Sequence, residues 1–180
     1  MDKKEALKQI KAGNKTKAQI KNFKKLEQEA LNGTGETGYY TDEFDYCLGR
    51  FAEDLCSAGQ KEWARKIYKI VEEKLDRSQI DSDIYLNLAE DIVAYLGDKE
   101  WARKIYKIVE DLFNRGQIDT VSVFCCGFAS DVAQNLGDKK WARKIYKEAE
   151  KDDEIEKRKL ANSIIEFLGD KEWAKKVQKS

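Results

Sequence analysis

The sequence contains no proline in its 180 residues. Proline marks turns, strand edges and helix ends, so a mixed α and β fold of this length would ordinarily contain several. Helices that are joined by turns of Gly, Asn and Asp need none. The absence therefore counts against a loop-rich or mixed fold and favours an all-α protein.

Histidine is also absent, and the four cysteines form no C-x-x-C pair. Without histidine, Cys47, Cys56, Cys125 and Cys126 make a poor zinc set. We expect reduced core thiols, no metal site and no other cofactor. Catalysis finds little support for the same reason, because no nucleophile and base form a recognisable motif. We expect a protein that is not an enzyme, and a carboxylate- or Cys-dependent enzyme stays the least favoured alternative.

Long apolar runs are missing too. None approaches the roughly 20 residues that a membrane-spanning helix needs. The lysine-rich N-terminus lacks the apolar segment of a secretory signal. Basic and acidic residues number 34 each, so the formal net charge is zero. We expect a cytoplasmic protein with no membrane partner.

An internal repeat dominates what is present. Residues 88–107, 128–147 and 160–179 align without a gap, and residues 51–69 align after one deletion. Each copy contains a Trp four residues after a Gly, and the Trp residues are spaced by 38, 40 and 32 positions. Such periods are typical of stacked supersecondary units. The four anchors of the units are Trp63, Trp101, Trp141 and Trp173.

Both halves of each copy have the 3.6-residue period of an amphipathic helix. Between them, Gly97 can adopt the left-handed conformation that ends the first helix, and Asp98 can cap the second. The short turn predicts an antiparallel helical hairpin. We expect the Trp of each copy in the core, and the Tyr five residues later at the edge of the apolar face with its hydroxyl at the surface. The predicted helices cover 3–12, 16–31, 43–57, 61–76, 83–96, 99–114, 121–136, 139–151, 154–168 and 171–179.

The hairpins resemble the tetratricopeptide and related helical-hairpin repeat families over about residues 44–180. The Trp that follows the Gly and the missing terminal proline depart from the tetratricopeptide pattern, so the resemblance implies architecture alone. It implies an all-α, right-handed stack of antiparallel helical hairpins with about ten helices. We expect one folding unit, with a basic helical cap and Gly-rich loop in residues 1–41 and the repeats in residues 42–180.

Two charged surfaces are candidates for a binding role. A protein–protein interaction scaffold, adaptor or inhibitor would hold another protein on the concave layer of its hairpins or on its acidic, tyrosine-rich N-terminal segment. An immunity or antitoxin-type protein, which would hold a basic toxin on the acidic layer of first helices, is one form of this. The residues predicted for this role are Tyr39, Tyr40, Asp42, Glu43, Asp45, Glu53, Asp54, Glu90, Asp91 and Asp131.

The alternative is a protein that binds the nucleic-acid backbone through a basic ladder on the second helices. Arg and Lys four residues apart repel each other, so helix stability does not explain their recurrence. Repeat duplication that left two solvated faces would explain it, and zero net charge counts against a phosphate binder. The ladder consists of Arg65, Lys69, Arg103, Lys107, Arg143 and Lys147.

Overall fold

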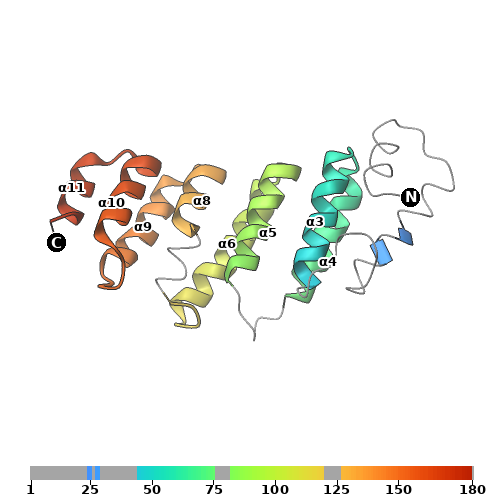
Figure 1. Cartoon of the computed structure of the whole chain (residues 1–180), viewed down its shortest axis with the longest axis horizontal. Helices are drawn as coiled ribbons and strands as arrows, with labels where there is room; N and C mark the ends of the chain where they lie inside the picture. The colour runs from blue at the N-terminus through green and yellow to red at the C-terminus, as the bar shows by residue number, and fades with distance from the viewer. Residues whose placement is uncertain (1–23, 26, 29–43, 76–81, 120–126, 180) are drawn as a thin grey trace. The chain divides into compact units, whose positions relative to one another are not determined.

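The computed structural model describes residues 24–25, 27–28, 44–75, 82–119 and 127–179 (Figure 1). Every regular element within these ranges is helical, and none is a strand. The all-α fold class predicted from the missing proline is therefore confirmed for the described part of the chain. The described residues fall into two compact units.

The first compact unit contains α3 (Phe44–Ser57) and α4 (Lys61–Lys74), which pack against each other. It spans residues 1–78 and also includes residues 94–97. Phe51 and Trp63 meet edge to face in its core, with ring centroids 6.1 Å apart. The buried and reduced Cys56 lies in the same hairpin.

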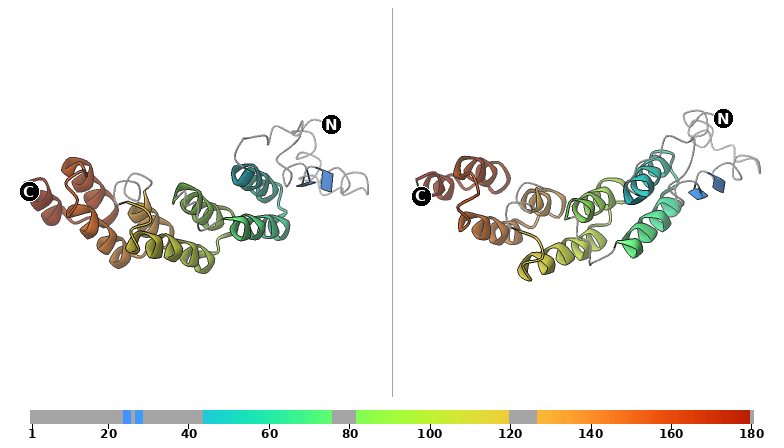
Figure 2. Two further views of the ribbon diagram at one scale, coloured as in Figure 1. Left: turned by 90° about the horizontal axis from the view of Figure 1, so that it is seen from below. Right: turned by 60° about the horizontal axis from the view of Figure 1, so that its bottom comes forward.

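The second compact unit contains three hairpins. The first is α5 (Ser82–Asp91), which continues as the π-helix η1 (Ile92–Leu96), followed by α6 (Lys99–Asn114), although residues 94–96 of η1 group with the first unit. The second is α8 (Phe128–Asn135) with α9 (Lys139–Glu150). The third is α10 (Lys157–Ser163), continued by the π-helix η2 (Ile164–Leu168), with α11 (Lys171–Val177). Helix α8 packs on α5 and α6, and α9 packs on α10 (Figure 2).

The turn inside each full copy has the predicted chemistry. Gly97, Gly137 and Gly169 have φ values of 73°, 74° and 76°. This left-handed region costs glycine nothing, whereas a Cβ would be strained there. The Asp after each Gly caps the next helix, since the Asp98, Asp138 and Asp170 carboxylates accept hydrogen bonds from the backbone N–H of the following Trp. In the first hairpin Gln60 replaces this Asp and makes no side-chain cap hydrogen bond.

The one-residue deletion in the first copy has a structural counterpart at the helix end. There, the backbone N–H of Gln60 bonds to the carbonyl of Leu55, five residues back. In the longer copies, the backbone N–H groups of Asp98 and Asp138 donate to the carbonyls of Ile92 and Val132, six residues back. The additional residue is therefore absorbed in a widened final turn, which is a π-helix at η1. Such single insertions are a common origin of π turns in α-helices.

The core follows the predicted apolar face. Trp101 and Trp141 are 9% and 6% exposed, which confirms them as core residues, whereas Trp63 and Trp173 are half-buried. The Ala after each Trp is fully or almost fully buried and allows the two helices of a hairpin to approach closely.

The prediction that the repeated tyrosine hydroxyls lie at the surface is wrong. Tyr68, Tyr106 and Tyr146 are at most 1% exposed. Tyr106 shows the reason, because Asn135 of α8 donates a hydrogen bond to its hydroxyl oxygen at 3.1 Å. The following hairpin thus covers a flank of the helix that would be exposed in an isolated hairpin.

Two predicted helix starts also need correction. Helix α8 begins at Phe128 rather than at residue 121, because Gly127 before it has φ 83° and cannot belong to a continuous helix. Helix α10 begins at Lys157 rather than at residue 154. The predicted helix 3–12 lies outside the described residues. Of the predicted helix 16–31, residues 24, 25, 27 and 28 are described, and these are helical.

Candidate functional site

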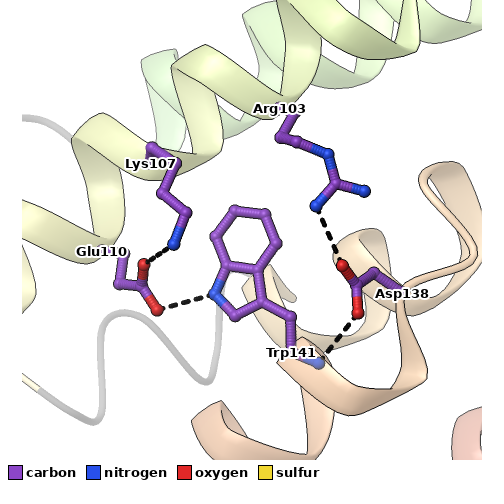
Figure 3. Close-up of polar contacts among 5 residues, drawn as sticks. All are labelled: Arg103, Lys107, Glu110, Asp138 and Trp141. Atoms are coloured by element: carbon purple, nitrogen blue, oxygen red, sulfur yellow. Dashed lines mark hydrogen bonds and ion pairs between the residues drawn. The ribbon is translucent and has the colours of Figure 1, made fainter.

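Trp141 is held by side chains of two hairpins (Figure 3). Its indole Nε1 donates to Glu110 Oε1 of α6 at 2.7 Å. The Asp138 carboxylate accepts the Trp141 backbone N–H with one oxygen and Arg103 Nη1 of α6 with the other, at 3.0 and 2.9 Å. Lys107 pairs with Glu110 and places its Nζ 4.3 Å from the centre of the Trp141 ring. These side chains join α6 to the start of α9, and we call the arrangement the hairpin clip.

The arginine–carboxylate and indole–carboxylate contacts recur one hairpin later, whereas Lys147, the counterpart of Lys107, forms no ion pair within the described ranges. Arg143 of α9 donates to Asp170 Oδ2 at 2.7 Å, and its guanidinium carbon lies 5.0 Å from the centre of the Trp173 ring. The indole of Trp173 donates to Glu150 Oε2 at 3.0 Å. A cation close to an indole ring contributes roughly 0.5–2 kcal/mol, depending on how far it is desolvated. The hairpin clip is therefore a repeated stabilising contact between neighbouring hairpins.

Glu27 makes the equivalent carboxylate contact in the first compact unit. It accepts a hydrogen bond from Trp63 Nε1 at 3.0 Å. Glu110 and Glu150 each lie nine residues after the Trp of their own hairpin and accept the indole N–H of the next one. Ala18, not a Trp, stands nine residues before Glu27, so the repeat pattern does not predict this contact.

Hydrogen bonds hold the pKa of both cap carboxylates in the clips below the usual range. At Asp138 the hydrogen bond from Arg103 has the largest effect, followed by the backbone N–H of Trp141. At Asp170 the order is reversed, with the Trp173 backbone N–H ahead of Arg143. Both carboxylates are therefore ionised at neutral pH, and the fold supplies the cation that compensates each of them.

The basic ladder is thus largely structural in the second compact unit. Arg103, Lys107 and Arg143 are all engaged with carboxylates and tryptophan rings in the hairpin clips. Contact between hairpins explains why an arginine recurs at 103 and 143, but it does not explain the lysine of the ladder, because Lys147 makes no such contact within the described ranges. The remaining ladder residues lie on α4 and α9, where Arg65 is half-buried and Lys69 and Lys147 are exposed.

The predicted acidic residues are only partly brought together. In the first compact unit, Glu53 and Asp54 are half-buried, and Glu53 accepts the Tyr95 hydroxyl at 3.4 Å and pairs with Arg50 at 3.6 Å. In the second, Glu90 is exposed on α5, and Asp91 of α5 and Asp131 of α8 are half-buried. The side chain of Asp45 and all of Tyr39, Tyr40, Asp42 and Glu43 lie outside the described residues.

Asp131 has unusual electrostatics among these acids. Burial raises its pKa, and the nearby Glu90 carboxylate raises it further, to about 7. Burial is also the main reason that the pKa of Tyr146 is raised, with Asp131 and the exposed Glu166 adding to the effect. The pKa of Tyr106 is raised mainly by burial, and Asp131 raises it further. We call the carboxylates of Glu90, Asp131 and Glu166 the acidic patch; the Tyr106 and Tyr146 side chains, whose pKa values these acids raise, are buried and are not part of its surface.

The acidic patch lacks the basic side chains that neutralise the aspartates of the clips. Within the described ranges, no Lys or Arg forms an ion pair with Asp131 or Glu90. Sequence reasoning selected Asp131 and Glu90 but missed the tyrosines, because it placed their hydroxyls at the surface. Chemically, such a patch suits a positively charged group that would restore the usual ionisation of Asp131.

Comparisons with known proteins give no match: no protein-family model, no curated protein and no solved structure resembles this chain significantly. Among the described residues, no three His, Cys, Asp or Glu side chains lie together in a way that could hold a metal ion. In the same part of the chain, no helix has the length and apolar character needed to cross a membrane.

Proposed function

We propose that this chain is a protein–protein interaction module, and that the acidic patch receives a positively charged segment of the partner protein. The hairpins would continue as a right-handed stack of about ten helices, in the manner of tetratricopeptide-like proteins. An inhibitor of the immunity or antitoxin type, with a basic toxin as its partner, is one concrete form of this function. The proposal includes no catalytic role.

The observation that carries the proposal is the contrast between Asp131 and the clip aspartates. Asp138 and Asp170 have arginine partners and lowered pKa values, so their charges stabilise the fold. Asp131 has a raised pKa beside Glu90 and no cationic partner within the described ranges. Keeping such a carboxylate ionised costs free energy in the isolated protein. A lysine or arginine from a partner would stabilise the ionised form and offset this cost.

The arginines of the basic ladder offer less support for the alternative function, which is nucleic-acid binding. Arg103 and Arg143 already donate to carboxylates at 2.9 and 2.7 Å. A phosphate would have to compete with these contacts, and breaking them would loosen the link between hairpins. Within the described ranges, Asp131 and Glu90 form no ion pair with a Lys or Arg, which favours a cationic partner on the first helices.

Binding of a defined cationic probe tests the proposal. The probe is a helical peptide of about 15 residues rich in Lys and Arg, and its affinity is measured by isothermal titration calorimetry. Replacing Glu90 by Gln and Asp131 by Asn together should weaken binding about tenfold, because one charge-assisted contact contributes roughly 1.5–3 kcal/mol. The E100Q/E172Q variant is the matched control, because it removes two exposed acids from the second helices.

The control should bind the peptide as the wild type does. Equal weakening in both variants would mean that overall charge governs binding rather than the acidic patch. Absence of binding in the wild type at low salt would contradict the proposal directly.

A further inference from the structure

Helix α9 has an exposed row of lysines that the other copies do not share. Lys140, Lys144 and Lys147 are exposed and occupy positions i, i+4 and i+7, so they follow one face of the helix. At the position of Lys140, the other second helices have an acid instead. These equivalent acids are Glu62 in α4, Glu100 in α6 and Glu172 in α11.

This substitution is unfavourable for the isolated helix. Lys140 lies in the first turn of α9, which contains no acidic residue. A helix N-terminus carries a partial positive charge, so a cation there is disfavoured and the Glu of the other copies is favoured. Lys140 and Lys144 also repel each other as a like-charged pair four residues apart. Helix stability therefore does not account for the lysine row.

Other lysines of the same unit are neutralised within the fold. Lys107 pairs with Glu110, Lys151 with Glu148 and Lys175 with Glu172. Within the described ranges, Lys140, Lys144 and Lys147 form no ion pair or hydrogen bond through their side chains. Three uncompensated ammonium groups thus point into solvent from one helix.

Two neighbouring helices carry an exposed lysine at an equivalent position. The hairpin clips join α6 to α9 through Trp141 and α9 to α11 through Trp173. Lys104 of α6 and Lys176 of α11 have the same register as Lys144 and are likewise exposed. We call these five side chains the lysine field: Lys104, Lys140, Lys144, Lys147 and Lys176.

We propose that the lysine field binds the phosphate backbone of a nucleic acid, without reading its bases. The field consists of flexible ammonium groups, which act as point charges and have no fixed geometry for reading bases. Phosphate backbones require only flexible positive charges at suitable spacing. The field therefore fits a polyanion.

Fluorescence anisotropy with a labelled duplex DNA and a single-stranded RNA tests this proposal. With about four phosphate contacts, affinity should fall roughly 100-fold between about 50 and 200 mM salt. The K140Q/K144Q/K147Q variant should bind about tenfold or more weakly than the wild type at low salt and show a shallower salt dependence. The K61Q/K66Q/K69Q variant removes three exposed lysines from α4 and is the matched control.

The control variant should retain most of the affinity, and scrambling the nucleic-acid sequence should have little effect. Equal loss in both triple variants would overturn the proposal, because net charge alone would then govern binding. Lack of binding by the wild type at low salt would overturn it as well. Tighter binding of an acidic polypeptide than of either nucleic acid would assign the field to a protein partner instead. Circular dichroism of each variant shows whether it folds. The K140E variant, which restores the Glu of the other copies, provides a single-residue test.

Discussion

Two aspartates seven residues apart illustrate how local contacts decide what a charge does in this protein. Asp138 caps α9 and accepts Arg103, and its pKa is lowered. Asp131 is half-buried near Glu90, and its pKa is raised. The first residue stabilises the fold as a carboxylate, whereas the second does so only in its protonated form.

Replacing Asp131 by Asn should reveal this difference in a pH-dependent way. The pKa of Asp131 in the folded state, about 7, lies above its value of roughly 3.9 in an unfolded chain. Between these values the folded protein binds the additional proton, so the wild type loses stability as pH rises from about 4 to 7. D131N should therefore be more stable than the wild type by about 1 kcal/mol at pH 8, after allowing for solvent screening, and similar to it near pH 4. Urea unfolding at both pH values measures this, and a constant difference would contradict it.

Replacing Asp138 separates its two roles. D138A removes both the helix cap and the partner of Arg103, and we expect a loss of about 1–2 kcal/mol in the free energy of unfolding. D138N keeps a good capping side chain and removes only the charge, so its loss should be smaller. Because the pKa of Asp138 is lowered, the wild type keeps this stabilisation above pH ~4 and loses it only in stronger acid. Equal losses in the two variants at pH 7 would exclude a separate capping role.

Single-helix periodicity predicted the buried residues that face the partner helix of the same hairpin. It placed Trp101, Trp141 and the alanines after them correctly. It misplaced Tyr106 because that side chain is covered by the next hairpin, through Asn135. It also predicted that Arg103 faces solvent, for the same reason. The predictions were wrong for residues whose surroundings come from another hairpin, because the period of one helix does not encode contacts with other hairpins.

At the scale of the helix and its turns, the Gly-Asp junction was the most predictable part of the structure. A glycine stop and an aspartate cap act through the backbone of adjacent residues, so the local sequence determines both. The widened final turn was visible only as a one-residue difference in length between copies. Ile92 and Val132, whose carbonyls accept the hydrogen bonds that close the widened turns, are both fully buried, and burial by neighbouring helices is not encoded in the local sequence.

Replacing Gly137 tests the junction without disturbing packing. Its φ is 74°, and a Cβ built on it would meet no atom within 4 Å. The cost of G137A should therefore be conformational alone, about 1 kcal/mol in the free energy of unfolding. G137N should cost less, because Asn tolerates the left-handed region better than Ala. Thermal or urea unfolding of the three proteins should rank them Gly, Asn, Ala, and a stabilising Ala would contradict the left-handed turn.

For the molecule as a whole, the hairpin clip determines how neighbouring hairpins depend on one another. In repeat proteins, stability is roughly a sum of terms for each repeat and for each contact between neighbours. The contact between α6 and α9 contains an indole hydrogen bond, an arginine–carboxylate pair and two cations near the Trp141 ring. This concentration of polar contacts on one tryptophan makes the contact between hairpins specific as well as stabilising.

Breaking the clip should uncouple the hairpins before it unfolds them. The R103Q/E110Q variant removes the Arg103–Asp138 ion pair and the carboxylate acceptor of the Trp141 indole N–H, and leaves Lys107 as the remaining side chain of α6 near the Trp141 ring. We expect a loss of about 1–3 kcal/mol in the free energy of unfolding. Amide hydrogen exchange should then become faster in α8 and α9 than in α6, whereas the wild type should protect these helices to a similar degree.

The K104Q/D111N variant changes the same numbers of charges at exposed positions of α6 and is the matched control. It should leave both stability and the exchange pattern close to those of the wild type. If R103Q/E110Q behaves like this control, the clip contributes little free energy, and the arginines at 103 and 143 would have to be explained by a ligand rather than by the neighbouring hairpin.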